Sequence, residues 1–194
     1  MQIAVIKYNA GNIRSVSFAL ERLGVSFSIT DSSEEIQSAD KVIFPGVGEA
    51  NSTMRYLRDR KLDEVIKNLR QPTLGICLGM QLMCRYSEEN DTTCLGIFDE
   101  TVVRFKSETL KVPHMGWNSL ENVCGWLEPS LENNYVYFVH SYFVPLSSHT
   151  VAQTDYGVPF TAALQKDNFY AVQFHPEKSA ESGVMVLQNF LQQK

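Results

Sequence analysis

The sequence predicts an α/β fold with a doubly wound, mostly parallel central sheet, flanking helices and an antiparallel meander in the second half. Short apolar runs alternate with helical segments throughout the first half, as they do in doubly wound sheets. The second half instead carries short β-branched and aromatic runs separated by turn residues, which is typical of antiparallel strands. No linker, repeat or low-complexity stretch divides the 194 residues, so we expect one domain over residues 1–194.

Strands and connecting helices account for the first half. We expect strands at the short apolar runs over residues 3–6, 25–29, 41–44 and 73–76. Apolar spacing predicts helices over 13–23 and 50–69, the second broken near Arg60, and the polar segment 31–38 has features of a helix start. Turn residues over 9–12 follow the first strand. The third and fourth strands run into glycine-rich loops at their carboxyl ends, where such sheets bind ligands.

The second half is expected to add further strands and a closing helix. The expected strands cover residues 101–105, 135–140, 142–145, 150–156, 160–164 and 169–174. Residues 181–191 place Val184, Leu187, Phe190 and Leu191 on one face, which predicts an amphipathic helix.

Composition excludes several classes of function. The net charge of −5 and the absence of a basic cluster argue against binding to nucleic acid or to an anionic membrane. The segment Met1–Ile6 resembles a core strand and not a signal peptide, and no apolar run approaches membrane-spanning length. We therefore expect a cytoplasmic protein.

The cysteines predict neither a disulfide framework nor a metal site. They are Cys77, Cys84, Cys94 and Cys124, with no Cys-x-x-Cys pair and no histidine at zinc-finger spacing. We expect free thiols, no structural metal and no cofactor, with the last three cysteines packed as small hydrophobic side chains.

One stretch, Thr73–Leu82, has the pattern of a nucleophile elbow. An apolar strand ends in Gly-x-Cys-x-Gly and passes into residues 81–86, which we expect to be helical. Gly75 and Gly79 would allow a tight turn around Cys77, and a helix N-terminus there would favour the thiolate. The backbone N–H of Leu78 would then face a developing oxyanion. The alternative is a buried cysteine between two packing glycines.

A cysteine nucleophile needs a base and a group that orients the base. His175 follows a predicted strand, and Glu177 lies two residues on, on the same side of an extended chain. The carboxylate could bond Nδ1–H and leave Nε2 facing the thiol, as in a catalytic triad. The alternative is a strand-end histidine paired with a surface glutamate. Of the other histidines, we expect His149 to be solvated and His114 and His140 to be structural or partner-facing.

A second oxyanion donor is expected from another loop at the strand ends. Residues 45–48 have the sequence Pro-Gly-Val-Gly, and two glycines give the backbone N–H groups near Gly46 and Val47 freedom to turn. The alternative is an ordinary strand-to-helix turn.

With Gly75–Gln81 and His175–Glu177 both in view, the whole chain resembles the class I (triad) glutamine amidotransferases. Three further motifs are similar to those of the glutaminase subunits of imidazole glycerol phosphate synthases, which act in histidine biosynthesis. They are Pro-His-Met-Gly-Trp-Asn at 113–118, Tyr-Phe-Val-His-Ser-Tyr at 137–142 and Lys178-Ser179 after the His-Pro-Glu motif. The loops at 9–12 and 45–48 fit the same subfamily.

This resemblance implies a reaction and a role for each motif residue. Cys77 would attack the side-chain amide of L-glutamine to give a thioester and ammonia, and water would then release glutamate. His175 would act as base and then acid, with Glu177 orienting it. The implied oxyanion donors are the N–H groups of Leu78 and of the Gly46–Val47 loop. The implied glutamine-binding residues are Gln81, Glu89, Ser141 and Tyr142.

The resemblance also implies a partner. Ammonia would pass to a separate (β/α)8-barrel cyclase subunit and react with a phosphoribulosyl-formimino aminoimidazole carboxamide ribonucleotide, giving imidazole glycerol phosphate and the aminoimidazole carboxamide ribonucleotide. The chain has no P-loop-type phosphate motif of its own. The implied docking residues are Asn12, Trp117, Tyr137 and Lys178. The alternatives are core or sheet packing for Trp117 and Tyr137 and plain solvation for Lys178.

Other functions remain open at this stage. The chain could be the glutaminase subunit of a synthase that amidates a nucleotide or sugar precursor, or a stand-alone cysteine hydrolase acting on γ-glutamyl or peptide bonds. It could also be a regulatory module with an inert cysteine, although every residue of the triad pattern is present.

Overall fold

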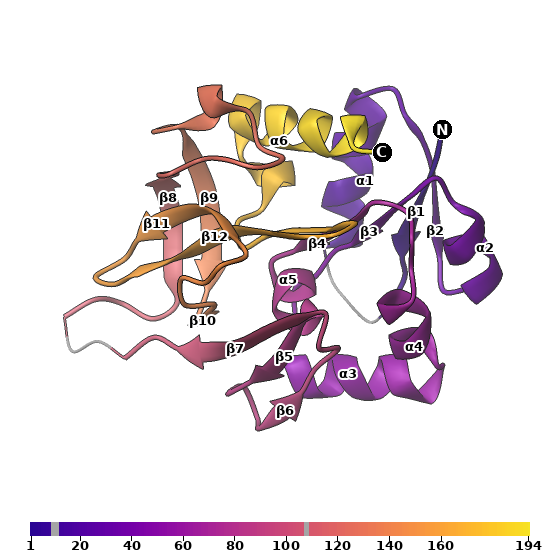
Figure 1. The fold of residues 1–194 in the computed structure, drawn as a ribbon, viewed down its shortest axis with the longest axis horizontal. Coiled ribbons are helices and arrows are strands. Elements are labelled where there is room, and N and C mark those ends of the chain that lie inside the picture. Colours follow the sequence, from indigo (N-terminus) through magenta and orange to yellow (C-terminus); the bar gives the residue numbers. More distant parts are fainter. Residues whose placement is uncertain (9–11, 107–108) are drawn as a thin grey trace.

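A seven-stranded sheet runs through the centre of the computed structural model, which describes residues 1–8, 12–106 and 109–194 (Figure 1). The strand order is β11-β12-β13-β4-β3-β1-β2. The parallel strands are β1 (Gln2–Ile6), β2 (Ser26–Thr30), β3 (Lys41–Phe44), β4 (Thr73–Ile76) and β13 (Phe169–Val172). The antiparallel strands are β12 (Pro159–Lys166) and β11 (Thr150–Asp155). The predicted fold class is confirmed.

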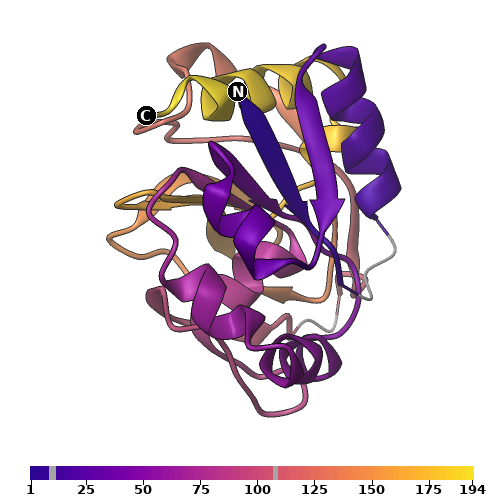
Figure 2. The same cartoon turned by 90° about the vertical axis from the view of Figure 1, so that its right-hand side faces the viewer.

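Helices cover both faces of this sheet (Figure 2). One face holds α1 (Ile13–Arg22) and α6 (Ala180–Gln192), and the other holds α2 (Ser33–Ser38), α3 (Ala50–Asp59), α4 (Leu62–Lys67) and α5 (Leu78–Met83). Strand β1 serves both cores, since Ile3 and Val5 pack with the first group of helices while Ala4 and Ile6 pack with the second. A continuously apolar strand fills two layers because successive side chains point to opposite faces.

Two smaller sheets flank the main one (Figure 1). One has the order β10-β7-β5-β6, formed by Tyr142–Phe143, Phe98–Arg104, Cys84–Ser87 and Thr92–Thr93. In the other, β8 (His114–Ser119) pairs antiparallel with β9 (Tyr135–His140). Short 3-10 turns, η1 and η2, lie at Pro129–Leu131 and Pro176–Lys178. These sheets carry three of the six strands expected from the second half of the sequence, and the central sheet carries the other three.

Several element predictions are wrong in detail. The helix expected over 81–86 ends at Met83, because the next four residues pair as β5 with β7. The last expected strand is antiparallel to β12 but also parallel to β4, so it joins the expected edge meander to the parallel part of the central sheet. Cys124 is exposed and not packed. Strand β8 was not expected, and residues 9–11 of the turn expected at 9–12 lie outside the described residues.

Two other expectations, the broken helix and the free thiols, agree with the structure. The long helical segment breaks between α3 and α4, where Lys61 adopts a left-handed conformation with φ 56°. Cys77, Cys84, Cys94 and Cys124 are free thiols. In the part of the chain that the structure describes, no helix is long and apolar enough to cross a bilayer, and no three acidic, histidine or cysteine side chains gather as metal ligands.

Candidate active site

Cys77 lies in a strained turn between β4 and α5. Its φ is 51° and its ψ is −104°, values that L-residues rarely adopt, and its N–H donates to the carbonyl of Val172 at 2.8 Å. Both flanking glycines are required by close packing. A Cβ on Gly75 would lie 2.8 Å from the Met83 sulfur, and one on Gly79 would collide with the carbonyl of Phe44. The elbow geometry expected from the sequence is therefore present, although α5 has only six residues.

His175 and Glu177 form a buried pair beside this turn. The distance from His175 Nδ1 to Glu177 Oε1 is 2.7 Å, and the two side chains are 0% and 1% exposed. His175 follows β13, which lies next to β4 in the sheet, so the imidazole reaches the elbow from the neighbouring strand. The two residues meet through the 3-10 turn η2 and not through extended chain as expected. Asn12 bonds the same carboxylate oxygen, and its Nδ2 is 3.3 Å from His175 Nδ1.

The charges around His175 favour its protonated form. Burial lowers the pKa of the imidazole, but the charges of Cys77 and Glu177 and hydrogen bonding to each of them outweigh burial and raise the pKa to about 10. With Nδ1 held by Glu177, Nε2 is the free ring nitrogen, and it is buried without a hydrogen-bond partner of ordinary geometry. The site can therefore hold an imidazolium whose remaining proton is available to a reacting group.

A cavity of about 280 Å³ opens above Cys77. Its lining contains most of the residues predicted to bind glutamine or an oxyanion: Val47, Leu78, Gln81, Glu89, Ser141 and Tyr142. Pro113, Val139 and His140 line it as well. One carboxylate oxygen of Glu89 accepts the N–H of Ala50 at 2.8 Å, and burial raises the pKa of this carboxyl group. The cavity suits a small ligand with both amide and charged groups.

A chain of amides connects this cavity to the cysteine. Gln81 Nε2 donates to the Tyr142 carbonyl at 2.9 Å and to Gln173 Oε1 at 3.0 Å. Gln173 Nε2 in turn lies 3.6 Å from Cys77 Sγ. Gln81 therefore has only its oxygen left for a ligand. Sequence reasoning missed Gln173, although its position two residues before His175 on alternating chain was a usable signal.

The loop after β3 makes the remaining contact with the elbow. The N–H of Leu78 donates to the carbonyl of Gly46 at 3.3 Å. The predicted oxyanion donor is thus occupied by the protein itself. The Gly46 carbonyl and the Val47 N–H belong to one peptide unit, so a rotation of that unit would exchange one for the other.

The family of the chain follows from comparison with known proteins. The family model described as glutamine amidotransferase class-I matches residues 4–194. The chain belongs to the class I glutamine amidotransferase family. It is 61% identical to the imidazole glycerol phosphate synthase subunit HisH of Bacteroides thetaiotaomicron over 194 residues, covering 98% of this chain and 99% of the relative. It is 46% identical to the Haemophilus influenzae protein of that name, covering 99% and 98% of the two chains.

Solved structures agree with this amidotransferase fold. A structure titled as a glutamine amidotransferase superposes with a TM-score of 0.76 at 18% identity, covering 97% of both chains. The PurLQS structure from Thermotoga maritima superposes with a TM-score of 0.73 at 16% identity, covering 98% of this chain and 97% of that one. At this level of identity the likeness concerns the fold alone.

The candidate site contains a histidine pair that the sequence analysis did not place there. His114 and His140 are 3% and 6% exposed, with His114 Nδ1 3.1 Å from His140 Nε2. His140 Nδ1–H donates to the Tyr142 carbonyl at 2.8 Å. Burial lowers the pKa of His114 to about 4 and that of His140 to about 3, so both are neutral. They support the wall of the cavity and are not partner-facing.

The side chains predicted to dock a partner lie in different settings. Asn12 is buried and bonds Glu177, so it faces the predicted triad and not solvent. Trp117 is 51% exposed on β8, and its ring lies 6.0 Å from that of Tyr137 on β9. Lys178 is exposed, with Nζ 5.9 Å from the centre of the Tyr137 ring. The last three form one surface close to the site.

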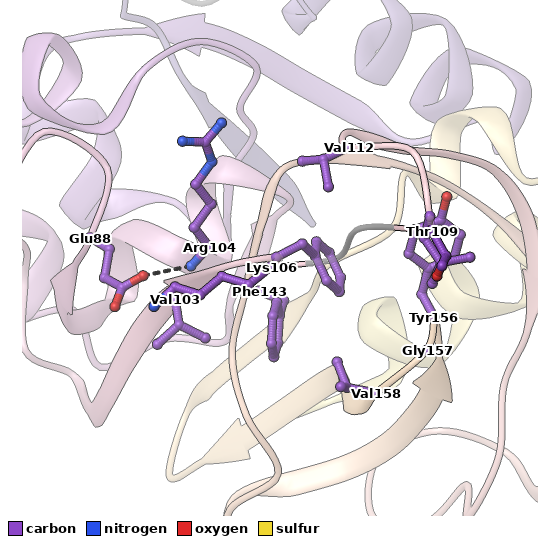
Figure 3. A pocket seen from close by; sticks show the side chains of 12 residues that line it. Glu88, Val103, Arg104, Lys106, Thr109, Val112, Phe143, Tyr156, Gly157 and Val158 are labelled. Carbon is purple, nitrogen blue, oxygen red and sulfur yellow. Dashed lines mark hydrogen bonds between the residues drawn. The ribbon is translucent and has the colours of Figure 1, made fainter.

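A second cavity, of about 370 Å³, lies beyond β10 (Figure 3). Phe143 lines it, whereas the preceding residue, Tyr142, lines the cavity above Cys77. Arg104 and Lys106 also line it, and the Arg104 backbone N–H donates to Glu88 at 2.8 Å (Figure 3). It contains no residue of the predicted triad, so we assign the amidotransferase chemistry to the cavity above Cys77.

Proposed function

We propose that this chain is the glutaminase subunit of an imidazole glycerol phosphate synthase in histidine biosynthesis. It would release ammonia from L-glutamine and pass it to a (β/α)8-barrel cyclase subunit in the cytoplasm. The observation that carries the proposal is the buried His175–Glu177 pair beside the Cys77 elbow, together with the cavity of substrate size that Cys77 lines. The relatives at 46% to 61% identity bear the name of that synthase subunit. The family match over residues 4–194 supports a single domain.

The chemistry follows from the charges at the triad. The Cys77 thiolate attacks the side-chain carbonyl carbon of glutamine, and the carbonyl oxygen becomes an oxyanion. Because the raised pKa of His175 keeps the imidazole protonated, this ring gives its proton to the departing amine, and ammonia leaves. The resulting thioester is attacked by water, which loses a proton to His175. Glutamate then leaves and the thiolate is regenerated.

The polar groups of the cavity match the two ends of glutamine. The free oxygen of Gln81 can accept a hydrogen bond, and the carboxylate of Glu89 complements the α-ammonium group. The backbone at Ser141 and Tyr142 would hold the amino-acid end. Gln173 is added as a positioning residue, because its amide bonds both Gln81 and the cysteine sulfur.

The oxyanion donors would be completed only when the synthase is active. In the described arrangement the Leu78 N–H is bonded to the Gly46 carbonyl. Turning the Gly46–Val47 peptide would release the Leu78 N–H and present the Val47 N–H to the same oxyanion. Glycine on both sides of Val47 makes such a rotation inexpensive. We propose that acceptor binding at the cyclase causes this turn.

The cyclase would dock on the outer face of β8 and β9. Met115, Trp117 and Tyr135 are 63%, 51% and 60% exposed there, which is unusual for large apolar side chains. Tyr137 and Lys178 adjoin them, and the Val139 carbonyl on the same pair of strands lies 4.0 Å from Cys77 Sγ. A partner on this face would lie next to the point where ammonia is released. Asn12 would contribute through Glu177 and not through a docking contact.

Glutamate release by purified proteins tests the proposal. Wild type, Cys77→Ser and Cys124→Ser would each be assayed alone, with the cyclase, and with the cyclase plus its nucleotide acceptor. We expect strong stimulation of wild type by cyclase and acceptor together. Cys77→Ser should have no activity in any condition, and Cys124→Ser, which changes an exposed thiol outside the cavity, should match wild type.

Each other outcome excludes part of the proposal. Activity in Cys77→Ser would exclude the thioester mechanism. Full turnover by the isolated chain would indicate a stand-alone hydrolase. Cys77-dependent activity without stimulation by this cyclase would indicate a different synthase partner.

A further inference from the structure

Tyr8 directly contacts residues 45–48, the loop that carries the proposed oxyanion donor and is called the oxyanion loop below. The sequence analysis gave Tyr8 no role. It lies two residues beyond β1, and β1 is hydrogen bonded to β3 in the central sheet. The Tyr8 hydroxyl donates to the carbonyl of Pro45, the first residue after β3. The ring is 4% exposed and packs edge-on against Phe44, with ring centres 5.6 Å apart.

The same hydroxyl fills the space beside Gly46. A Cβ built on Gly46 would collide with the Tyr8 oxygen, and it would lie only 2.8 Å from Leu78 Cβ. The Tyr8 oxygen therefore packs directly against Gly46, at the start of the peptide that would rotate. Tyr8 thus holds the loop through two contacts: its hydroxyl bonds the Pro45 carbonyl of the preceding peptide, and its oxygen closes the space beside Gly46.

We infer that Tyr8 is a positioning residue that holds the oxyanion loop in its closed arrangement, with the Leu78 N–H bonded to the Gly46 carbonyl. This inference rests on the proposed function, and it deepens it by naming a side chain that suppresses glutaminase activity in the free subunit. A group that stabilises the closed loop lowers the fraction of molecules with a free oxyanion donor. To reach the catalytic arrangement, the loop would have to break the hydrogen bond between Tyr8 and Pro45 or lose the packing of the Tyr8 oxygen against Gly46.

The state of the tyrosine agrees with this role. Burial, together with the nearby charge of Cys77, raises its pKa well above 10, so the hydroxyl keeps its proton and remains a donor. The contact also reaches the loop from β1 and not from the elbow. Removing it therefore leaves the triad bonds of His175 and Glu177 intact.

The test compares Tyr8→Phe with wild type, alone and in the complete synthase with cyclase and acceptor. In the free chain we expect kcat for glutamine hydrolysis to rise about fivefold, equivalent to about 1 kcal/mol of barrier, with KM changed less than twofold. The fully stimulated rate should change less than twofold, so the stimulation ratio falls about fivefold. Tyr170→Phe is the matched control, because Tyr170 is also buried but packs against Trp126 and Phe190.

A chemical probe separates loop release from general loosening. Alkylation of Cys77 by iodoacetamide, measured by mass spectrometry of the Cys77 peptide, needs the thiolate but no oxyanion donor. Its rate and the melting temperature should stay at wild-type values in Tyr8→Phe. A free-chain kcat that is unchanged or lower overturns the inference, as does a rise matched by faster alkylation. If wild type itself is not stimulated by cyclase and acceptor, the proposed function fails and not the role of Tyr8.

Discussion

The two sides of Cys77 differ in how far they are prepared for catalysis. On one side, called the prepared side below, Glu177 and Asn12 hold the His175 ring in a fully buried position. On the other side, called the loop side below, the N–H of Leu78 is bonded to the carbonyl of Gly46. The free chain thus holds the proposed base in place, but its expected oxyanion donor is not free.

Physical chemistry explains why regulation would act on the loop and not on the triad. An imidazolium and a carboxylate buried together are stable only while they remain paired, so taking them apart and rebuilding them would be costly. A peptide unit next to glycine carries no charge and can rotate at small cost. A partner can therefore control the reaction by turning one peptide while the charged groups stay in place.

The largest effect is expected from the prepared side. Replacing Glu177 by Gln keeps the side-chain size but removes the charge that holds the imidazolium, so kcat should fall about 10³-fold. The fall should be similar in the free chain and in the stimulated synthase, because the triad is the same in both. Steady-state glutamate release measures it. Glu181→Gln, at an exposed position on α6, is the control and should match wild type.

A different fall in kcat in the free chain and in the stimulated synthase would contradict the view that the prepared side is already complete in the free chain. If Glu177→Gln reduced only the stimulated rate, the triad itself would have to be rearranged by the partner.

A smaller and unequal effect is expected from the loop side. In Gly46→Ala the new Cβ would lie 2.8 Å from Leu78 Cβ and 3.0 Å from Gly79 N, so the loop cannot seat against the elbow. The stimulated kcat should fall about 10²-fold, the usual effect of losing one oxyanion donor. The basal rate should change much less, because that donor is already occupied in the free chain. Equal losses in both states would show that the loop contributes before activation.

The residues of the proposed triad could be picked out from the sequence because their signals are local. The glycines at positions 75 and 79 flank the cysteine, and the base and its carboxylate are two residues apart. The error at residues 84–86 shows the limit of a local pattern. We expected these residues to be helical, but pairing with β7 provides backbone bonds that override that preference.

The missed residues depend on contacts between distant segments. Tyr8 reaches Pro45 because β1 lies beside β3, and His140 reaches His114 because β9 pairs with β8. Gln173 reaches the cysteine from β13, which is next to β4. No local pattern states which strands are neighbours, so these supporting contacts appear only once the sheet order is known.

The smallest expected effect is a pH dependence that reports the prepared side alone. The pKa of His175 is about 10 in the folded chain, against an ordinary value of 6.5, chiefly because of Cys77 and Glu177 acting against burial. Between these values the folded chain keeps a proton that the unfolded chain has lost. The resulting stabilisation is complete below about pH 6.5 and is lost as the pH rises through about 10.

Urea unfolding between pH 7 and pH 10 should therefore show a free energy of unfolding that falls with pH in wild type. The slope should be weaker in Cys77→Ala, which lacks the charge that raises the pKa. Ring-proton NMR of His175 in both proteins assigns the effect to this residue, with the lower pKa expected in the variant. Equal titration curves would mean that sulfur and imidazole do not interact in the free chain. The partner would then have to bring the sulfur and the imidazole together, just as it would have to turn the loop.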